Sequence, residues 1–527
     1  TTIKNLILSA VLVVGGASCV DLDTAPYDRE TDLTYWEEDP EAAVKALNTC
    51  YTYLGNMDEQ LYCEAMTDNA YTKQPNIGNG SYSTADPYVK KVWDGRYTGI
   101  RMCNELLENI DRVPDLDPEL KKRYIGEAKV LRAYNYYELY TKFGDVPYTT
   151  KVLSIKESMS IARTAKATVI ANVLADLDEV INGNYLPTSY DADNKGRITR
   201  WAAMAIKAKI YLFEGNWTQV KNITSTIMTE GGFKLFESYA GLFEIANEYN
   251  SEVILDAQYR PTSREHQMMY VFLPPTLGGY SQLSPLQELV DSYIMLDGKT
   301  IKETGTSFDE SHPYANRDPR LKATVMYTGN SYTLADGTEV VINCEKGEGK
   351  DGYGVGSDCS ATGYYIKKYW DNTYRATLYS GLNPILIRYA DILLMNAEAL
   401  AELGELDKTA WDATIKPIRD RAGFTLASAL EFPEGASKDK LIEIVRNERR
   451  SELALEGHRH KDIIRWRIAD NVLNGWCHGL KTNDVVGTDD GYVRVENRTF
   501  NANRHYLWPI PQAERDLNGN LEQNPNW

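Results

Sequence analysis

Residues 117–147 read DPELKKRYIGEAKVLRAYNYYELYTKFGDVP, and this stretch predicts a long helix from 117 to 142. Asp117 and Pro118 are a typical helix start, because an aspartate can cap free backbone N–H groups and a proline fits the first turn. We expect the helix to close before Gly144. Apolar residues at helical spacing predict further helices at 39–54, 88–112, 166–183, 199–214, 217–229, 386–403, 407–421 and 437–456.

Several of the expected helices form close pairs with alanines at the contact positions. Small residues let two helices approach closely, and a following glycine permits a tight turn into the next helix. The alanines are Ala202, Ala203, Ala205 and Ala208 before Gly215, and Ala397, Ala399 and Ala401 before Gly404. This pattern is typical of helix-hairpin repeats such as TPR, although its period is irregular. From about 230 to 385, Gly, Tyr, Thr and Pro are frequent and predict loops with short strands.

Five ordered motifs carry a resemblance that runs nearly the whole length of the chain. They are EAKVLRAY at 127–134 with FGDVP at 143–147, NRDPRL at 316–321, RYADILL at 388–394, RNERR at 446–450, and LWPIP at 507–511 with QNP at 523–525. Together they resemble the SusD/RagB outer-membrane lipoproteins of Bacteroidetes nutrient-uptake systems. The resemblance implies a mainly α, SusD-like fold with four TPR-like helix-hairpin units, plus an irregular region of loops and short strands that carries the ligand site.

We therefore expect one SusD-like domain over residues 39–527. Its helical parts are expected at about 39–230 and 386–470, and its irregular, ligand-binding part at about 230–385. The charged motif residues are predicted to pair between helices, because long charged side chains near a core need partners. These residues are Arg446, Glu448, Arg449 and Glu452, and Arg388 with Asp391.

The first 18 residues, TTIKNLILSAVLVVGGAS, predict a signal peptide that is too short to span a bilayer. Small residues before Cys19 are typical of cleavage at Ser18/Cys19 after lipidation of the thiol. Acyl chains on Cys19 would anchor the protein without a membrane-spanning helix. Because Gly16 stands where the lipobox usually has leucine, an ordinary secretory cleavage site is the alternative.

Residues 19–38 would then form a lipidated leader. In it, Asp21 and Asp23 resemble the acidic export tag of surface lipoproteins in these bacteria; the alternative is a solvated flexible segment. By this resemblance the protein is lipid-anchored in the outer membrane and faces the cell exterior.

The charge of the chain argues against polyanionic partners. With 57 basic and 75 acidic residues, the net charge is −18, so neither nucleic acid nor an anionic lipid surface would gain counterion-release energy. Tyrosine, in contrast, is abundant, with 36 residues. Its flat apolar face and hydrogen-bonding tip suit wet recognition surfaces and sugar rings.

The motifs of common enzymes are missing or lie in the wrong context. No HExxH, GxxxxGK[ST] or GxSxG occurs, and the GxGxxG match at 347–352 is not followed by an amphipathic helix. With 75 acidic residues, no single carboxylate pair is evidence for glycoside hydrolysis. We predict no enzyme, no cofactor and no catalytic metal. A structural calcium at Asp351, Asp358 and Asp371 is left open, although these residues lack EF-hand spacing.

Six cysteines follow Cys19. Cys50 and Cys103 lie in expected helices and are predicted to be buried thiols. Cys344 and Cys359 flank a glycine-rich loop, and both alternatives, a disulfide or two free thiols, are open.

Most of the candidate ligand residues lie in two loops that the family resemblance indicates. The first is 67–76, TDNAYTKQPN, and the second is 270–280. In both loops aromatic rings could stack on sugar faces while amides, carboxylates and arginine bind hydroxyls. The candidates are Asp68, Asn69, Tyr71, Tyr270 and Tyr280, with Tyr374 and Arg375 from a third, polar loop. For each tyrosine, a packed or merely exposed ring is the alternative.

The function that the resemblance implies is non-catalytic glycan capture at the cell surface. The partner would be a SusC-like TonB-dependent transporter, over which the lipoprotein acts as a hinged lid. One alternative is a RagB-like protein that captures peptides for a peptide importer, and the other is a hydrolase on a lipoprotein tether. The tyrosine-rich loops favour a glycan over a peptide.

Overall fold

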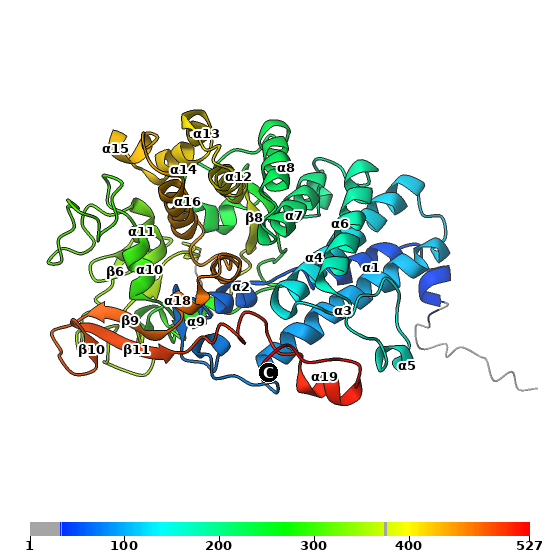
Figure 1. Cartoon of the computed structure of the whole chain (residues 1–527), viewed down its shortest axis with the longest axis horizontal. Coiled ribbons are helices and arrows are strands. Elements are labelled where there is room, and N and C mark those ends of the chain that lie inside the picture. Colours follow the sequence, from blue (N-terminus) through cyan, green and yellow to red (C-terminus); the bar gives the residue numbers. More distant parts are fainter. Residues whose placement is uncertain (1–31, 33, 374–376) are drawn as a thin grey trace, which may run out of the picture.

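The computed structural model describes residues 32, 34–373 and 377–527, and the fold is mainly helical (Figure 1). Helices α1 and α3 to α8 form one side of the molecule, α2 lies near its centre, and helices α12 to α16 continue along its top. The other side holds the loops and short strands, with the β9–β11 hairpin at its lower edge.

The first four helices are α1 (Ala42–Tyr51), α2 (Met57–Glu64), α3 (Pro87–Asn109) and α4 (Pro118–Phe143). As predicted, Asp117 caps α4: its Oδ1 accepts a hydrogen bond of 2.9 Å from the N–H of Leu120. Asp86 caps α3 in the same way, and each cap is followed by a proline. Gly144, with φ of 71°, ends α4.

The later long helices are α6 (Lys166–Asn182), α7 (Arg200–Phe213), α8 (Trp217–Glu230), α12 (Tyr389–Leu403) and α16 (Lys438–Glu452). Neighbours pack in the order α3, α4, α6, α7, α8, α12, α16. This helical stack therefore brings the sequence before 230 and the sequence after 389 together, although more than a hundred residues of irregular chain separate them.

The predicted helices are present with three differences. The helix expected at 407–421 is two helices, α13 (Lys408–Ala413) and α14 (Ile415–Ala422), because Thr414 leaves the helical conformation with φ −125° and ψ −69°. The helix expected from 386 begins at Tyr389, since strand β8 (Ile385–Arg388) precedes it. The last one ends at Glu452, and Leu455 has a positive φ of 63°.

The irregular region holds small antiparallel sheets. Its strands pair as β1 (Ala70–Thr72) with β3 (Leu283–Pro285), β2 (Val253–Asp256) with β8, β4 (Val325–Met326) with β7 (Tyr365–Ile366), and β5 (Ser331–Thr333) with β6 (Glu339–Val341). A three-stranded sheet has the order β10 (Thr488–Asp489), β11 (Tyr492–Arg498), β9 (Gly475–Lys481). The β1–β3 pair connects the first loop that the family resemblance indicated, which contains β1, with the segment that follows the second loop, since β3 begins at Leu283.

Short helices complete the structure. They are α5 (Ile155–Ser158), α9 (Met268–Phe272), α10 (Gln287–Ser292), α11 (Pro319–Thr324), α15 (Ala427–Leu430), α17 (Arg459–Arg465), α18 (Ala469–Val472) and α19 (Gln512–Leu517).

The C-terminal segment belongs to the core of the helical stack. Trp508, Ile510 and Leu521 pack with the apolar faces of α1, α3, α4, α6 and α7. The Asn524 amide donates hydrogen bonds of 2.9 Å to the carbonyl of Phe143 and of 2.7 Å to the carbonyl of Trp508. Residues 508–524 therefore complete the core that the first helices form. A second core lies under the loops and short strands.

Candidate functional site

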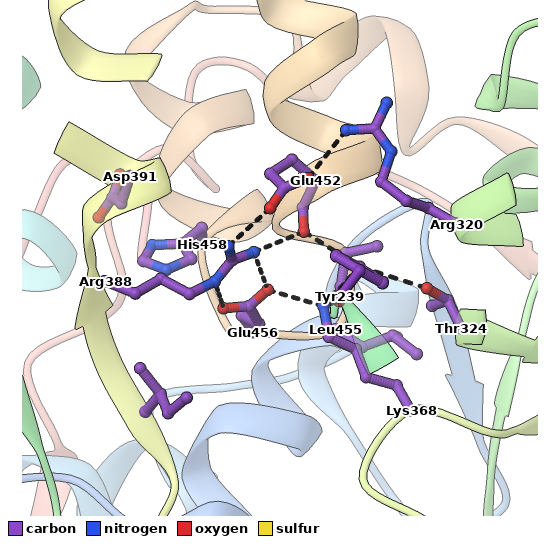
Figure 2. Close-up of polar contacts among 12 residues, drawn as sticks. Tyr239, Arg320, Thr324, Lys368, Arg388, Asp391, Glu452, Leu455, Glu456 and His458 are labelled. Atoms are coloured by element: carbon purple, nitrogen blue, oxygen red, sulfur yellow. Dashed lines mark hydrogen bonds and ion pairs between the residues drawn. The ribbon is translucent and has the colours of Figure 1, made fainter. Parts of the chain in front are cut away.

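A buried network of charges joins the helical stack to the irregular region (Figure 2). Arg388 lies at its centre and contacts Glu252 at 2.7 Å, Glu452 at 2.6 Å and Glu456 at 2.7 Å. Glu452 also contacts Arg320 at 2.9 Å. We call these five residues the charged frame; each is at most 4% exposed. Because α16, β8 and α11 each contribute to it, the frame fixes these elements relative to one another.

The motif residues are paired between elements, as predicted. Glu448 contacts Arg320 at 2.7 Å, Arg449 contacts Asp391 at 2.6 Å, and Arg446 contacts Glu402 at 3.0 Å. Arg388 and Asp391 have different partners: Arg388 belongs to the charged frame, whereas Asp391 is held by Arg449 and, at 2.5 Å, by Lys209.

The electrostatics of the frame are those of a structural network. Burial alone would raise the pKa of Glu456, but Arg388 and Lys368 lower it to about 2. Burial in turn lowers the pKa of Lys368 to about 8, against the opposing effect of Glu456 at 2.6 Å. Glu456 is thus ionised and paired with two cations, an arrangement that holds segments together.

The first predicted loop, residues 67–76, is anchored by Arg450 and Arg459, which are close in sequence to Glu452 and Glu456 of the charged frame. The Asp68 carboxylate contacts Arg459 at 2.8 Å and Arg450 at 3.0 Å, and these arginines lower its pKa although burial opposes them. The Asn69 amide accepts a hydrogen bond of 2.9 Å from Arg450 and donates one of 2.8 Å to Glu64. Both side chains are buried, so these contacts hold the loop in place. That they bind ligand hydroxyls stays a prediction, and the observed contacts favour a supporting role.

Strand β1 places Tyr71 next to β3 on one side and near the β9–β11 hairpin on the other. Tyr71 is half-buried and pairs with Ser284 of β3. Its pKa is raised, first by burial and then by the nearby Glu496 of β11 and Cys477 of β9. Two residues on, the Lys73 ammonium donates to the carbonyls of Ser357 at 2.7 Å and Cys359 at 2.6 Å. The loop is thereby also tied to the glycine-rich segment.

The second predicted loop, residues 270–280, begins within helix α9, which carries Tyr270, and it presents a pair of parallel rings. The rings of Tyr270 and Tyr280 stack with centroids 5.3 Å apart and an interplanar angle of 6°. The N–H of Tyr280 donates to the carbonyl of Tyr270 at 2.9 Å, which holds the turn between them closed. Tyr280 remains 44% exposed. An aromatic ring supported on one face and open to solvent can stack on the apolar face of a sugar.

The structure adds a tryptophan that the sequence analysis missed. Trp476 of β9 is 43% exposed and lines a cavity of about 410 Å³ together with Asp68, Arg450 and Glu288. The guanidinium of Arg494 lies 5.6 Å from the centre of its ring. The available signal was a tryptophan in the short segment Gly475–Lys481, but nothing local in the sequence connects it with Asp68.

Some predicted residues lie apart or outside the described chain. Cys19, Tyr374 and Arg375 fall outside the described residues. The three aspartates considered for calcium have separate surroundings: Asp351 accepts from the N–H of Thr276 at 2.8 Å, Asp371 accepts from the backbone of Thr373 at 2.7 Å, and Asp358 is exposed. Within the described residues, no group of three or more His, Cys, Asp or Glu is arranged to hold a metal ion.

The cysteines of the described chain are free thiols. Cys50 and Cys103 are buried, as predicted. Of the two alternatives for Cys344 and Cys359, the structure has free, buried thiols, and the Cys359 thiol lies 3.3 Å from the carbonyl of Lys350.

Comparisons with known proteins establish the family of the chain. A family model described as "SusD family" matches residues 242–527, and one described as "Starch-binding associating with outer membrane" matches residues 38–212. The SusD-like protein P25 of Formosa agariphila is 27% identical over 514 residues, 89% of this chain and 91% of that protein.

Solved structures give the same result. A SusD-like carbohydrate binding protein from Bacteroides fragilis superposes with a TM-score of 0.82 at 28% identity, covering 93% of this chain and all of that one. A second SusD-like protein from the same species has a TM-score of 0.80 at 27% identity, with 95% and 100% coverage.

These matches define the class of the protein: a non-catalytic binding protein of the SusD type. The chain belongs to the SusD family, as the motifs predicted. Because members of this family are non-catalytic binding proteins, the prediction of binding without chemistry is confirmed, and so is the mainly helical SusD-like fold. The number of TPR-like units stays a prediction. None of the helices in the described ranges is long and apolar enough to cross a membrane.

Proposed function

We propose that this protein captures oligosaccharides or polysaccharides at the outer surface of the cell, without cleaving them. The observation that carries the proposal is the parallel Tyr270–Tyr280 stack, in which Tyr280 is 44% exposed and lies just before β3, the strand that pairs with β1. Fixed aromatic rings bind sugar faces at little entropic cost, because the rings do not have to be ordered on binding. The carbohydrate binding protein of Bacteroides fragilis, 28% identical, supports the ligand class.

The proposed ligand surface centres on Tyr280, Tyr270 and Tyr71, with Trp476 at its margin. In this proposal Asp68 and Asn69 hold the loop of Tyr71, and Tyr374 and Arg375 remain candidate contacts. The domain boundaries follow the sequence: residues 1–18 are removed, 19–38 form the lipidated leader, and 39–527 fold as one domain.

The proposed partner is a SusC-like TonB-dependent transporter in the outer membrane, to which the protein delivers its ligand while anchored through Cys19. The family description, which includes association with the outer membrane, supports this location. Affinity purification of the tagged, full-length protein from detergent-solubilised membranes of the native bacterium tests the partner. We expect a transporter of this class to copurify in equimolar amount, and its absence at every mild detergent tried would count against delivery.

The binding proposal is tested with the purified segment 20–527, using gel retardation on starch, laminarin, xyloglucan and galactomannan and fluorescence titration with mixed tryptic peptides. We expect retention by at least one polysaccharide. Tyr280→Ala should weaken it about tenfold, the effect of losing one stacking contact of roughly 1.4 kcal/mol. Tyr280→Phe keeps the ring and should bind like wild type.

Tyr249→Ala is the matched control, since Tyr249 is 41% exposed but lies outside both loops. Binding of peptides alone would assign the protein to the RagB-like, peptide-capturing alternative. Sustained release of reducing ends from a bound polysaccharide would contradict binding without catalysis.

A further inference from the structure

A wide groove has a lining that includes neither Tyr270 nor Tyr280. It has a volume of about 1310 Å³ and runs between four segments: residues 310–315, the turn at 327–329, the glycine-rich segment 343–348, and the end of β9 with the residues that follow, 480–484. Drug-sized ligands occupy pockets of about 300–1,000 Å³. A groove of this volume, open to solvent, suits a chain of several units better than a single small molecule.

Aromatic rings form part of the floor of this groove. Tyr314 stacks on Tyr327 with ring centroids 4.0 Å apart and an interplanar angle of 16°. The hydroxyl of Tyr314 lies 3.2 Å from that of Tyr364, which donates to Gln287 at 2.5 Å. Tyr327 and Tyr364 are buried whereas Tyr314 is only half-buried. The buried partners therefore fix one ring that still reaches the surface.

A second ring lines the groove from the hairpin. Tyr492 is half-buried, and the ammonium of Lys481 lies 5.3 Å from its centre. Lys481 also contacts Glu310 at 2.8 Å, which connects the hairpin with the opposite segment. Lys346 and Asp484 make a similar contact between the glycine-rich segment and the end of β9. These exposed pairs add little stability, but they link segments on different sides of the groove.

The charges that line the groove indicate which chain it accepts. Four carboxylates, Glu310, Glu345, Glu348 and Asp484, face two ammonium groups, Lys346 and Lys481. This excess of negative charge repels uronates and sulfates. The amides of Asn343 and Asn483 supply neutral donors and acceptors for hydroxyl groups.

We propose that this groove is a second binding surface, which takes a neutral polysaccharide chain through the rings of Tyr314 and Tyr492. The proposal rests on the proposed function, since it assigns a second contact for the same class of ligand. A polymer long enough to occupy the groove and the Tyr270–Tyr280 stack together would bind more tightly than either surface alone allows, because the second contact is intramolecular.

The test compares Tyr314→Ala, Tyr492→Ala and the double variant with wild type and the control Tyr249→Ala, in the segment 20–527. Retardation is measured in gels containing starch, laminarin, xyloglucan or galactomannan, and in gels containing alginate as an anionic probe. For the neutral polysaccharide that wild type binds, each single variant should weaken retention about tenfold. Tyr314→Phe and Tyr492→Phe should restore it, and alginate should not retard wild type.

Thermal melting separates loss of the ring from loss of the fold: Tyr492 lies on a hairpin, so its variant should melt within a few degrees of wild type even if Tyr314→Ala does not. Retention that Tyr280→Ala weakens, but that neither groove variant changes, would overturn this inference and leave the proposed function intact. Stronger retention by alginate than by every neutral polymer would overturn the assignment of a neutral ligand. Failure of wild type to bind any of the polysaccharides would overturn both proposals.

Discussion

The charged frame and the tyrosine stack lie in one chain but differ in what surrounds their side chains. Arg388 is 1% exposed and contacts three carboxylates, whereas Tyr280 is 44% exposed and its ring contacts one other ring. Removing a residue from the first region leaves charges buried without partners, while removing one from the second leaves a ring exposed to water. Stability should therefore depend on the first region and ligand binding on the second.

The largest effect is expected from Arg388→Met, which leaves Glu252, Glu452 and Glu456 without their shared cation. Breaking a buried ion pair by removing one partner costs about 3–5 kcal/mol of unfolding free energy. Chemical denaturation followed by circular dichroism measures the change. The control is Lys408→Met, which removes an ion pair with Asp412 at 2.6 Å from a lysine side chain that is 55% exposed. That pair contributes at most about 1 kcal/mol, so equal losses in the two variants would contradict the comparison.

The pH dependence of stability separates two buried glutamates. Burial raises the pKa of Glu64 from 4.5 to about 7, so the folded protein retains a proton that the unfolded chain has released. Its contribution to stability is therefore lost as the pH rises from 4.5 to 7. Glu456 behaves in the opposite way: its lowered pKa of about 2 gives stability that is present above pH 4.5 and is lost as the pH falls toward 2.

We expect Glu64→Gln to remove a fall in unfolding free energy between pH 4.5 and 7, and Glu456→Gln to remove one between pH 4.5 and 2. Difference curves from denaturation at each pH, variant minus wild type, isolate the two groups from other carboxyls. Two curves with the same sign of slope would show that the frame does not hold Glu456 ionised.

The smallest effects are expected from two glycine-to-alanine substitutions, one in the helical stack and one in the turn that carries Tyr280. Gly95→Ala in α3 adds a methyl group that meets no atom within 4 Å, so it should stabilise the helix by about 0.5–1 kcal/mol. Gly279→Ala would place its Cβ 2.0 Å from the carbonyl oxygen of Leu273, so the turn that carries Tyr280 must shift. We expect weaker polysaccharide retention from Gly279→Ala and unchanged retention from Gly95→Ala. Equal binding by both variants would show that the position of Tyr280 does not matter.

Sequence alone predicts the long helices well because the signals for them are local. The helix expected at 117–142 is α4, which spans Pro118–Phe143, since cap, periodicity and closing glycine all lie within the segment. Helix α2, Met57–Glu64, was not predicted. It lies only a few residues after α1, and its apolar residues form only a weak helical pattern along its short length.

The sequence predicted the proximity of candidate residues that are close together along the chain, but not of those that are far apart along it. Tyr270 and Tyr280 are close in the sequence, so their proximity could be expected; the structure places Tyr270 on α9 and stacks its ring on that of Tyr280. Trp476 could not be connected with Asp68, because the cavity that they share exists only once β9 has packed near the loop 67–76. Tyr314 and Tyr327 are likewise two ordinary tyrosines in the sequence, and only the fold stacks them.

The place of the C-terminal segment has a consequence for the order of folding. Trp508, Ile510 and Leu521 fill the core formed by the first helices, and Asn524 binds the carbonyl at the end of α4. A chain whose synthesis has only reached α8 lacks these groups, so its first core is incomplete and its apolar surface stays open to water. The first helices can therefore complete their packing only once residues 508–524 have been made, so the two parts of this core depend on each other across most of the sequence.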